Sequence, residues 1–185
     1  HAHQRRIHRE SIDGHGDVIT VSDSAVKTYM NPGSDDFSAV SPEIKGSSGI
    51  TSAAALALGD LDSNGFLDII NGNQMYLNPG GASAGSFVGV EPLPFASVGN
   101  DVKAIAVADI DLDGDQDVVL ADTASIKVYR NPTGSMNRYF QGSTFFAGVN
   151  PIVIPTGALP RAVLLTDLNG DGKPDLVVAL AAGAE

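Results

Sequence analysis

A nine-residue pattern of acidic residues around a glycine recurs three times along the chain. Each copy has Asp at positions 1 and 9, Asp or Asn at positions 3 and 5, and Gly at position 6. The copies are Asp60-Leu61-Asp62-Ser63-Asn64-Gly65-Phe66-Leu67-Asp68, Asp109-Ile110-Asp111-Leu112-Asp113-Gly114-Asp115-Gln116-Asp117 and Asp167-Leu168-Asn169-Gly170-Asp171-Gly172-Lys173-Pro174-Asp175. A weaker fourth copy ends at Asp17. Successive copies are about 50 residues apart, which excludes a helical-hairpin repeat.

Apolar segments lie on both sides of each clear copy, so each loop is predicted to join two buried strands. Further along, Tyr29, Tyr76 and Tyr129 each begin a Tyr-x-Asn-Pro sequence, and Asn-Pro is a turn signal that closes a third strand. A fourth strand is expected to begin near Phe37, Phe87 and Phe145. Four short antiparallel strands in about 50 residues are the layout of a β-propeller blade.

The predicted fold is therefore all-β, with about three to four blade units. The units run roughly over residues 9–50, 51–100, 101–158 and 159–185, and together they form one partial β-propeller, 1–185. The first unit has the polar residues 4–8 where the others have an apolar strand, so we expect the chain to begin partway into a blade.

The composition excludes several classes of function. The net charge is −11, with 22 acidic against 11 basic residues, which disfavours nucleic acid and anionic membranes and favours cations as partners. No apolar run approaches the roughly 18 residues of a membrane span. There is no cysteine, so disulfides and thiolate metal sites are excluded.

The loop spacing suits calcium, which takes six to eight oxygen ligands. Side chains at positions 1, 3, 5 and 9 can converge on one ion, position 7 can supply its carbonyl, and glycine at position 6 permits the sharp turn. We therefore predict about three calcium ions. Their ligands would be Asp60, Asp62, Asn64, Phe66 and Asp68, then Asp109, Asp111, Asp113, Asp115 and Asp117, then Asp167, Asn169, Asp171, Lys173 and Asp175.

Two other kinds of loop have similar sequences. An EF-hand requires an acidic residue at position 12, where this chain has Asn71, Leu120 and Val178, and it requires flanking helices instead of β-branched segments. The clusters could also be plain turns, because Asp, Asn and Gly favour turns for local reasons. Three copies in phase favour the metal.

The copies are not expected to bind equally. The loop that begins at Asp109 offers four carboxylates as side-chain ligands, at positions 1, 3, 5 and 9, and should bind most tightly. The first copy carries Arg9 at position 1 and only Ser11 at position 3, which leaves Asp13 and Asp17. We predict a weak or vacant site there.

These motifs resemble FG-GAP/VCBS repeats, the calcium-binding blade units of integrin α-subunit propellers and many secreted proteins. The resemblance is carried by the three Asp loops and the Tyr-x-Asn-Pro turns. It implies an extracellular or cell-surface location and, since such propellers usually have seven blades, a larger propeller. The remaining blades would come from the same molecule or a neighbouring one.

For function, we expect a non-enzymatic calcium-binding module for structure or adhesion, which contacts other proteins or further blades. No nucleophile, phosphate-loop or zinc motif indicates catalysis. The alternatives are a lectin that stacks glycans on Tyr29, Tyr76 and Tyr129, and an accessory propeller of a secreted hydrolase or lyase. Histidines 1, 3, 8 and 15 could bind a transition metal, but a frayed basic terminus explains them better.

Overall fold

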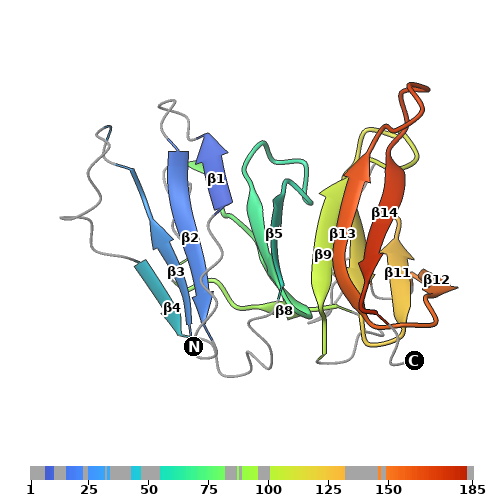
Figure 1. Cartoon of the computed structure of the whole chain (residues 1–185). Helices are drawn as coiled ribbons and strands as arrows, with labels where there is room; N and C mark the ends of the chain where they lie inside the picture. The colour runs from blue at the N-terminus through green and yellow to red at the C-terminus, as the bar shows by residue number, and fades with distance from the viewer. Residues whose placement is uncertain are drawn as a thin grey trace.

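The computed structural model describes residues 7–10, 16–22, 25–31, 33, 43–46, 55–81, 87, 89–95, 101–131, 146 and 149–182. Within them, strands form four sheets that follow one another in chain order across the molecule (Figure 1). Every strand pair is antiparallel, and in the three four-stranded sheets each strand pairs with the next one in the chain.

Each sheet comes from one repeat unit, and the bounds are as follows. The first contains β1 (Ile7–Glu10), β2 (Gly16–Ser22), β3 (Ala25–Tyr29) and β4 (Glu43–Gly46). The second contains β5 (Leu56–Gly59), β6 (Asp68–Asn71), β7 (Gln74–Tyr76) and β8 (Leu93–Pro94). The third contains β9 (Ala104–Ala108), β10 (Asp117–Ala121), β11 (Ser125–Tyr129) and β12 (Ile152–Pro155). The fourth contains β13 (Pro160–Thr166) and β14 (Asp175–Leu180).

The predicted all-β architecture of four-stranded antiparallel blades is confirmed. In the part of the chain that the structure describes, the sheets form an open row rather than a closed ring. No helix among those residues is long and apolar enough to cross a lipid bilayer.

Two details of the predicted blades were wrong. The first sheet has all four strands, because Ile7–Glu10 forms β1 against β2 despite its polar sequence. Backbone pairing within a hairpin does not require apolar side chains on both strands. The fourth strands of the first three units begin at Glu43, Leu93 and Ile152, not near Phe37, Phe87 and Phe145. Phe87 is instead buried in the core, while Phe37 and Phe145 lie outside the described residues.

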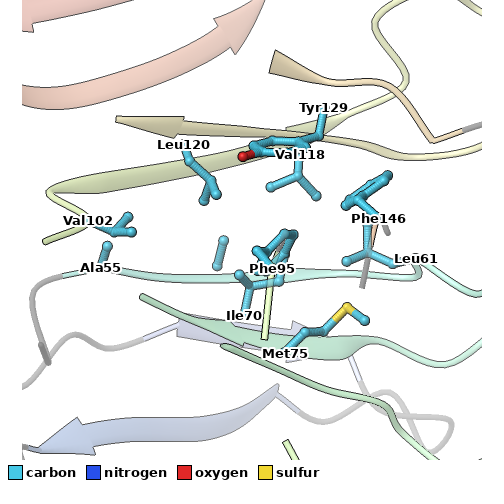
Figure 2. Close-up of a cluster of buried hydrophobic side chains, with 11 residues drawn as sticks. Ala55, Leu61, Ile70, Met75, Phe95, Val102, Val118, Leu120, Tyr129 and Phe146 are labelled. Carbon is cyan, nitrogen blue, oxygen red and sulfur yellow. The ribbon is translucent and has the colours of Figure 1, made fainter. Parts of the chain in front are cut away.

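The sheets pack face to face through side chains that alternate along their first two strands. Ala57 on β5 pairs with Ile70 on β6, and both belong to the core cluster between the second and third sheets. Figure 2 shows Ile70 and Met75 of the second sheet directed toward Val118, Leu120 and Tyr129 of the third. This packing buries the apolar face of each sheet against its neighbour, as a row of blades requires.

The next unit repeats the arrangement at equivalent positions. Ala106 on β9 pairs with Val119 on β10, and Val119 is fully buried in a cluster that includes Val163 and Leu165 of β13. The third and fourth sheets therefore pack as the second and third do.

The fourth sheet leaves the corresponding face uncovered. Leu164 on β13 pairs with Val177 on β14, in the register that Ala106 and Val119 occupy one unit earlier. In this structure Leu164 is 57% exposed and Val177 is 38% exposed. We call this surface, made by Leu164, Val177 and the adjacent Ala162 and Ala179, the outer face of β13–β14.

The repeat supplies a matched pair of variants for this packing. Val119→Thr places a hydroxyl in a buried apolar cluster and should lower the free energy of unfolding by about 1–3 kcal/mol. Val177→Thr, at the equivalent register position, should change it by no more than about 0.5 kcal/mol because the site is partly exposed. Chemical denaturation monitored by circular dichroism measures both. Equal losses of unfolding free energy in the two variants would contradict an exposed outer face.

Candidate metal centre

The three acidic loops connect the first strand of a sheet to the second, between β5 and β6, β9 and β10, and β13 and β14. Position 1 directly follows the first strand, and position 9 is the first residue of the second strand. Each loop therefore brings the two ends of its acidic pattern together at one end of a hairpin.

The aspartate at position 1 organises the turn by accepting backbone hydrogen bonds on both carboxylate oxygens. Asp60 accepts the N–H of Asn64 at 3.0 Å and of Gly65 at 2.8 Å. Asp109 and Asp167 accept N–H groups at the same two positions, 5 and 6, at distances of 2.8–3.2 Å. The three loops thus share one backbone conformation, fixed by the same side chain.

Two residues in each loop adopt positive φ. The glycine at position 6 does so in all three loops, with φ of 86° at Gly65, 99° at Gly114 and 82° at Gly172. Position 4 also does so, at Ser63 (51°) and Leu112 (61°). The positive φ at position 4 was not predicted from the sequence. Gly170 in the third loop is its sequence signal, since glycine adopts this conformation without steric strain.

The aspartate at position 9 ties the loop to the Asn-Pro turn that closes the third strand. Asp68 accepts the N–H of Leu61 at 2.9 Å on one oxygen and the N–H of Asn78 at 2.7 Å on the other. Asp117 accepts the equivalent N–H groups of Ile110 at 2.8 Å and Asn131 at 2.7 Å. This second role of position 9 was not predicted from the sequence.

Two of the loops gather three carboxylates each. Oxygens of Asp60, Asp62 and Asp68 lie within 4.8 Å of one another, and so do oxygens of Asp109, Asp111 and Asp117. We call these groups the first and second triads. Ligand oxygens on one calcium ion, each at 2.3–2.6 Å, lie at most about 5 Å apart, so each triad has the donor chemistry and spacing to hold a cation.

The predicted ligands of the third loop are arranged differently from those of the two triads. In the third loop, the described residues Asp167, Asp171 and Asp175 do not form such a group, and Asp167 and Asp171 are exposed. Asp175 accepts the N–H of Leu168, and Asn169 donates its side-chain N–H to Asp171.

Positions 5 and 7 mainly contact their own turns or neighbouring loops. Asn64 accepts the N–H of Phe66 at 2.8 Å, Asp113 accepts that of Asp115 at 3.0 Å, and Asp171 accepts that of Lys173 at 2.8 Å. The Phe66 ring packs directly on Gly80 of the following Asn-Pro-Gly turn. Asp113 is not among the carboxylates of the second triad.

The first copy has a different hairpin register. Arg9 pairs with Asp17, whereas in the third unit it is Ala108, the residue before position 1, that pairs with position 9. The first hairpin is therefore one residue shorter. Asp17 is buried and accepts the N–H of Asn31 at 2.8 Å, but its second oxygen lacks a hydrogen-bond partner. Ser11 and Asp13 lie outside the described residues.

Burial and crowding make negative charge costly in both triads. Burial raises the pKa of Asp68 to about 7, against the lowering effect of its two N–H partners, and the charges of Asp62 and Asp60 raise it further. Burial likewise raises the pKa of Asp62 and of Asp117. A bound divalent cation would remove this cost, because it attracts all three carboxylates at once.

The exposed third loop behaves differently. The hydrogen bond from Gly172 holds the pKa of Asp167 below its usual range. Backbone N–H groups of the loop thus stabilise the charged form of this carboxylate.

A family model described as FG-GAP-like repeat matches residues 13–70 and 109–178. These segments cover more than half of the chain, so the chain belongs to the FG-GAP-like repeat family. This match confirms the resemblance to FG-GAP repeats that the sequence motifs indicated. A comparison with curated proteins gives no match.

The raised pKa of Asp68 predicts a pH effect on the metal-free protein. Between about pH 4 and 7 the folded state keeps a proton that the unfolded chain has lost, so folding stability falls as the pH rises. Asp68→Asn mimics the protonated form and has no carboxyl group at this position to titrate. With a chelator present, we expect the stability of wild type relative to Asp68→Asn to drop by about 2–4 kcal/mol from pH 4 to 8.

Urea denaturation of both proteins across this pH range measures the difference. A difference that stays constant or increases with pH would contradict a raised Asp68 pKa.

Proposed function

We propose that this chain is a calcium-binding, non-enzymatic module of an extracellular or cell-surface protein, with a structural or adhesive role. The observation that carries the proposal is the pair of aspartate triads, built on repeated loops of an FG-GAP-like chain. Repeats of this family suggest a module of the kind used in adhesion and propeller domains.

Calcium is the cation that the triads fit best. Every residue of both triads is an aspartate, and calcium prefers such hard oxygen donors. Zinc prefers histidine and cysteine ligands, and neither triad contains either residue. Magnesium requires near-octahedral geometry and usually retains several waters. Affinities of about 10⁻⁴ to 10⁻³ M, typical of extracellular modules, would load the sites in calcium-rich fluid.

The outer face of β13–β14 supports a role in protein contacts. Its apolar side chains occupy register positions that are covered by a neighbouring sheet in the units before it, and Leu164 is more than half exposed. We propose that a further sheet of the same repeat type covers this face. Such a sheet would present apolar pairs like Val107 with Val118, which in the third sheet face the second sheet.

Two of the three tyrosines do not favour the lectin alternative, while Tyr29 is half-buried. Tyr76 is 1% exposed and Tyr129 is fully buried, and Tyr129 contacts Phe95 and Phe146 through its ring. Aromatic platforms for sugars need an accessible ring face. These two rings instead serve the packing between sheets.

Calcium should stabilise the protein, and Asp111→Asn tests which residues are responsible. At about 10 mM calcium, each site with the affinity above should add about 1–3 kcal/mol to the free energy of unfolding. Asp111 belongs to the second triad and has an ion pair with Arg130 at 3.7 Å. Asp111→Asn should therefore remove about half of the calcium effect and leave metal-free stability nearly unchanged.

Thermal and urea denaturation with calcium or with chelator measure this effect. Asp101→Asn, which replaces an exposed aspartate outside the loops, is the control and should retain the full calcium effect. No rise in stability or protease resistance with calcium in the wild type would refute calcium binding.

Association through the outer face can be tested on the protein alone, because a second copy can place its own exposed outer face against this one. We expect sedimentation velocity to show concentration-dependent association that Leu164→Lys abolishes while thermal stability is retained. A wild type that sediments as a monomer at every concentration would contradict association of this face with a sheet of its own kind.

A further inference from the structure

The loop of the third sheet reaches back to the loop of the second through two side chains. The side-chain oxygen of Gln116, at loop position 8, accepts the backbone N–H of Asp60 at 2.8 Å. Ser63 donates its hydroxyl hydrogen bond to Asp115, at loop position 7, also at 2.8 Å. The loop that contains the second triad is thus bonded to the first residue and the turn of the loop that contains the first triad.

This contact depends on a glycine at the end of β5. A Cβ atom at Gly59 would lie 2.6 Å from the Gln116 oxygen and 2.6 Å from a methyl group of Val107, distances that side-chain atoms do not tolerate. The glycine therefore allows the third unit to approach the backbone beside Asp60.

A hydrogen-bonded route also joins one triad to the other. Asp117 of the second triad accepts the N–H of Asn131 at 2.7 Å. The Asn131 side chain donates to the Leu61 carbonyl at 3.0 Å, and the N–H of Leu61 donates to Asp68 of the first triad at 2.9 Å. Three successive bonds connect a carboxylate in one triad to a carboxylate in the next.

The sequence provides this link at one boundary between units. Position 8 is Gln116 in the third unit, but it is Leu67 in the second and Pro174 in the fourth. Neither of those side chains has a hydrogen-bond acceptor. The serine at position 4 of the second unit's loop is replaced by Leu112 in the third, which lacks the hydroxyl.

We propose that Gln116, Ser63 and Asn131 couple the two triads, so that a cation bound at either one raises the affinity of the other. This inference rests on the proposed calcium binding. A cation in the second triad fixes Asp117 and the residues beside it, among them Asp115 and Gln116. These residues then hold the loop from Asp60 to Ser63 in its binding conformation, which lowers the entropy cost of loading the first triad.

The test follows each site separately by NMR during a calcium titration of the whole chain. The amides of Gly65 and Gly114 are the reporters, because each donates to the first aspartate of its own loop. Asp111→Asn disables the second triad and should raise the calcium midpoint of Gly65 by about fivefold or more. Asp62→Asn should raise the Gly114 midpoint by the same factor, because coupling between binding sites is reciprocal.

A double-mutant cycle separates coupling from a general loss of stability. Gln116→Met keeps the length of the side chain but removes the acceptor. In that background Asp111→Asn should move the Gly65 midpoint by a clearly smaller factor, because only the Ser63 and Asn131 contacts then remain. Ser63→Ala is a milder second variant that should weaken the effect. Gln74→Met, on β7 outside the loops, is the matched control and should leave the coupling intact.

Two results would overturn the inference, and they differ. If Asp111→Asn abolishes the Gly114 response but leaves the Gly65 midpoint unchanged, the sites are independent while calcium binding stands. If neither glycine responds to calcium in the wild type, the proposed function fails as well.

Discussion

The candidate metal sites depend on the hydrogen bonds made by the buried aspartate that begins the second strand of the second and third sheets. Asp68 and Asp117 are both fully buried, and each accepts an N–H from its own loop and another from the Asn-Pro turn after the third strand. A buried carboxylate is costly unless it is hydrogen-bonded, and these bonds hold it in place. The same side chain belongs to the triad of its loop, so one residue serves both the fold and the candidate metal site in the second and third units.

The fold could be predicted from the sequence because its pattern is local and repeated. Asp-rich turns between apolar segments, followed by Asn-Pro, predict antiparallel hairpins at a fixed spacing. The fourth strand was harder to place, because β8 has only two residues and the buried Phe87 lies outside the strands. Strand β1 also escaped prediction, since its pairing with β2 uses backbone groups that polar side chains do not reveal.

The candidate site could be predicted in part. The residue types predict where the loops are and that they resemble one another. They do not predict which carboxylates converge. Asp113 has the right spacing, yet its oxygen bonds the N–H of Asp115. The third loop has a similar sequence but is exposed, so burial does not force its acids together. Contacts such as that of Gln116 with Asp60, 56 residues apart, depend on how the sheets pack, and no local pattern contains that information.

Anomalous scattering from crystals soaked with terbium, a trivalent substitute for calcium, tests the central claim most directly. The account predicts one strong peak among Asp60, Asp62 and Asp68 and another among Asp109, Asp111 and Asp117, each within ligand distance of all three carboxylates. Well-ordered triads without a peak in either, or peaks confined to other acidic residues, would contradict it.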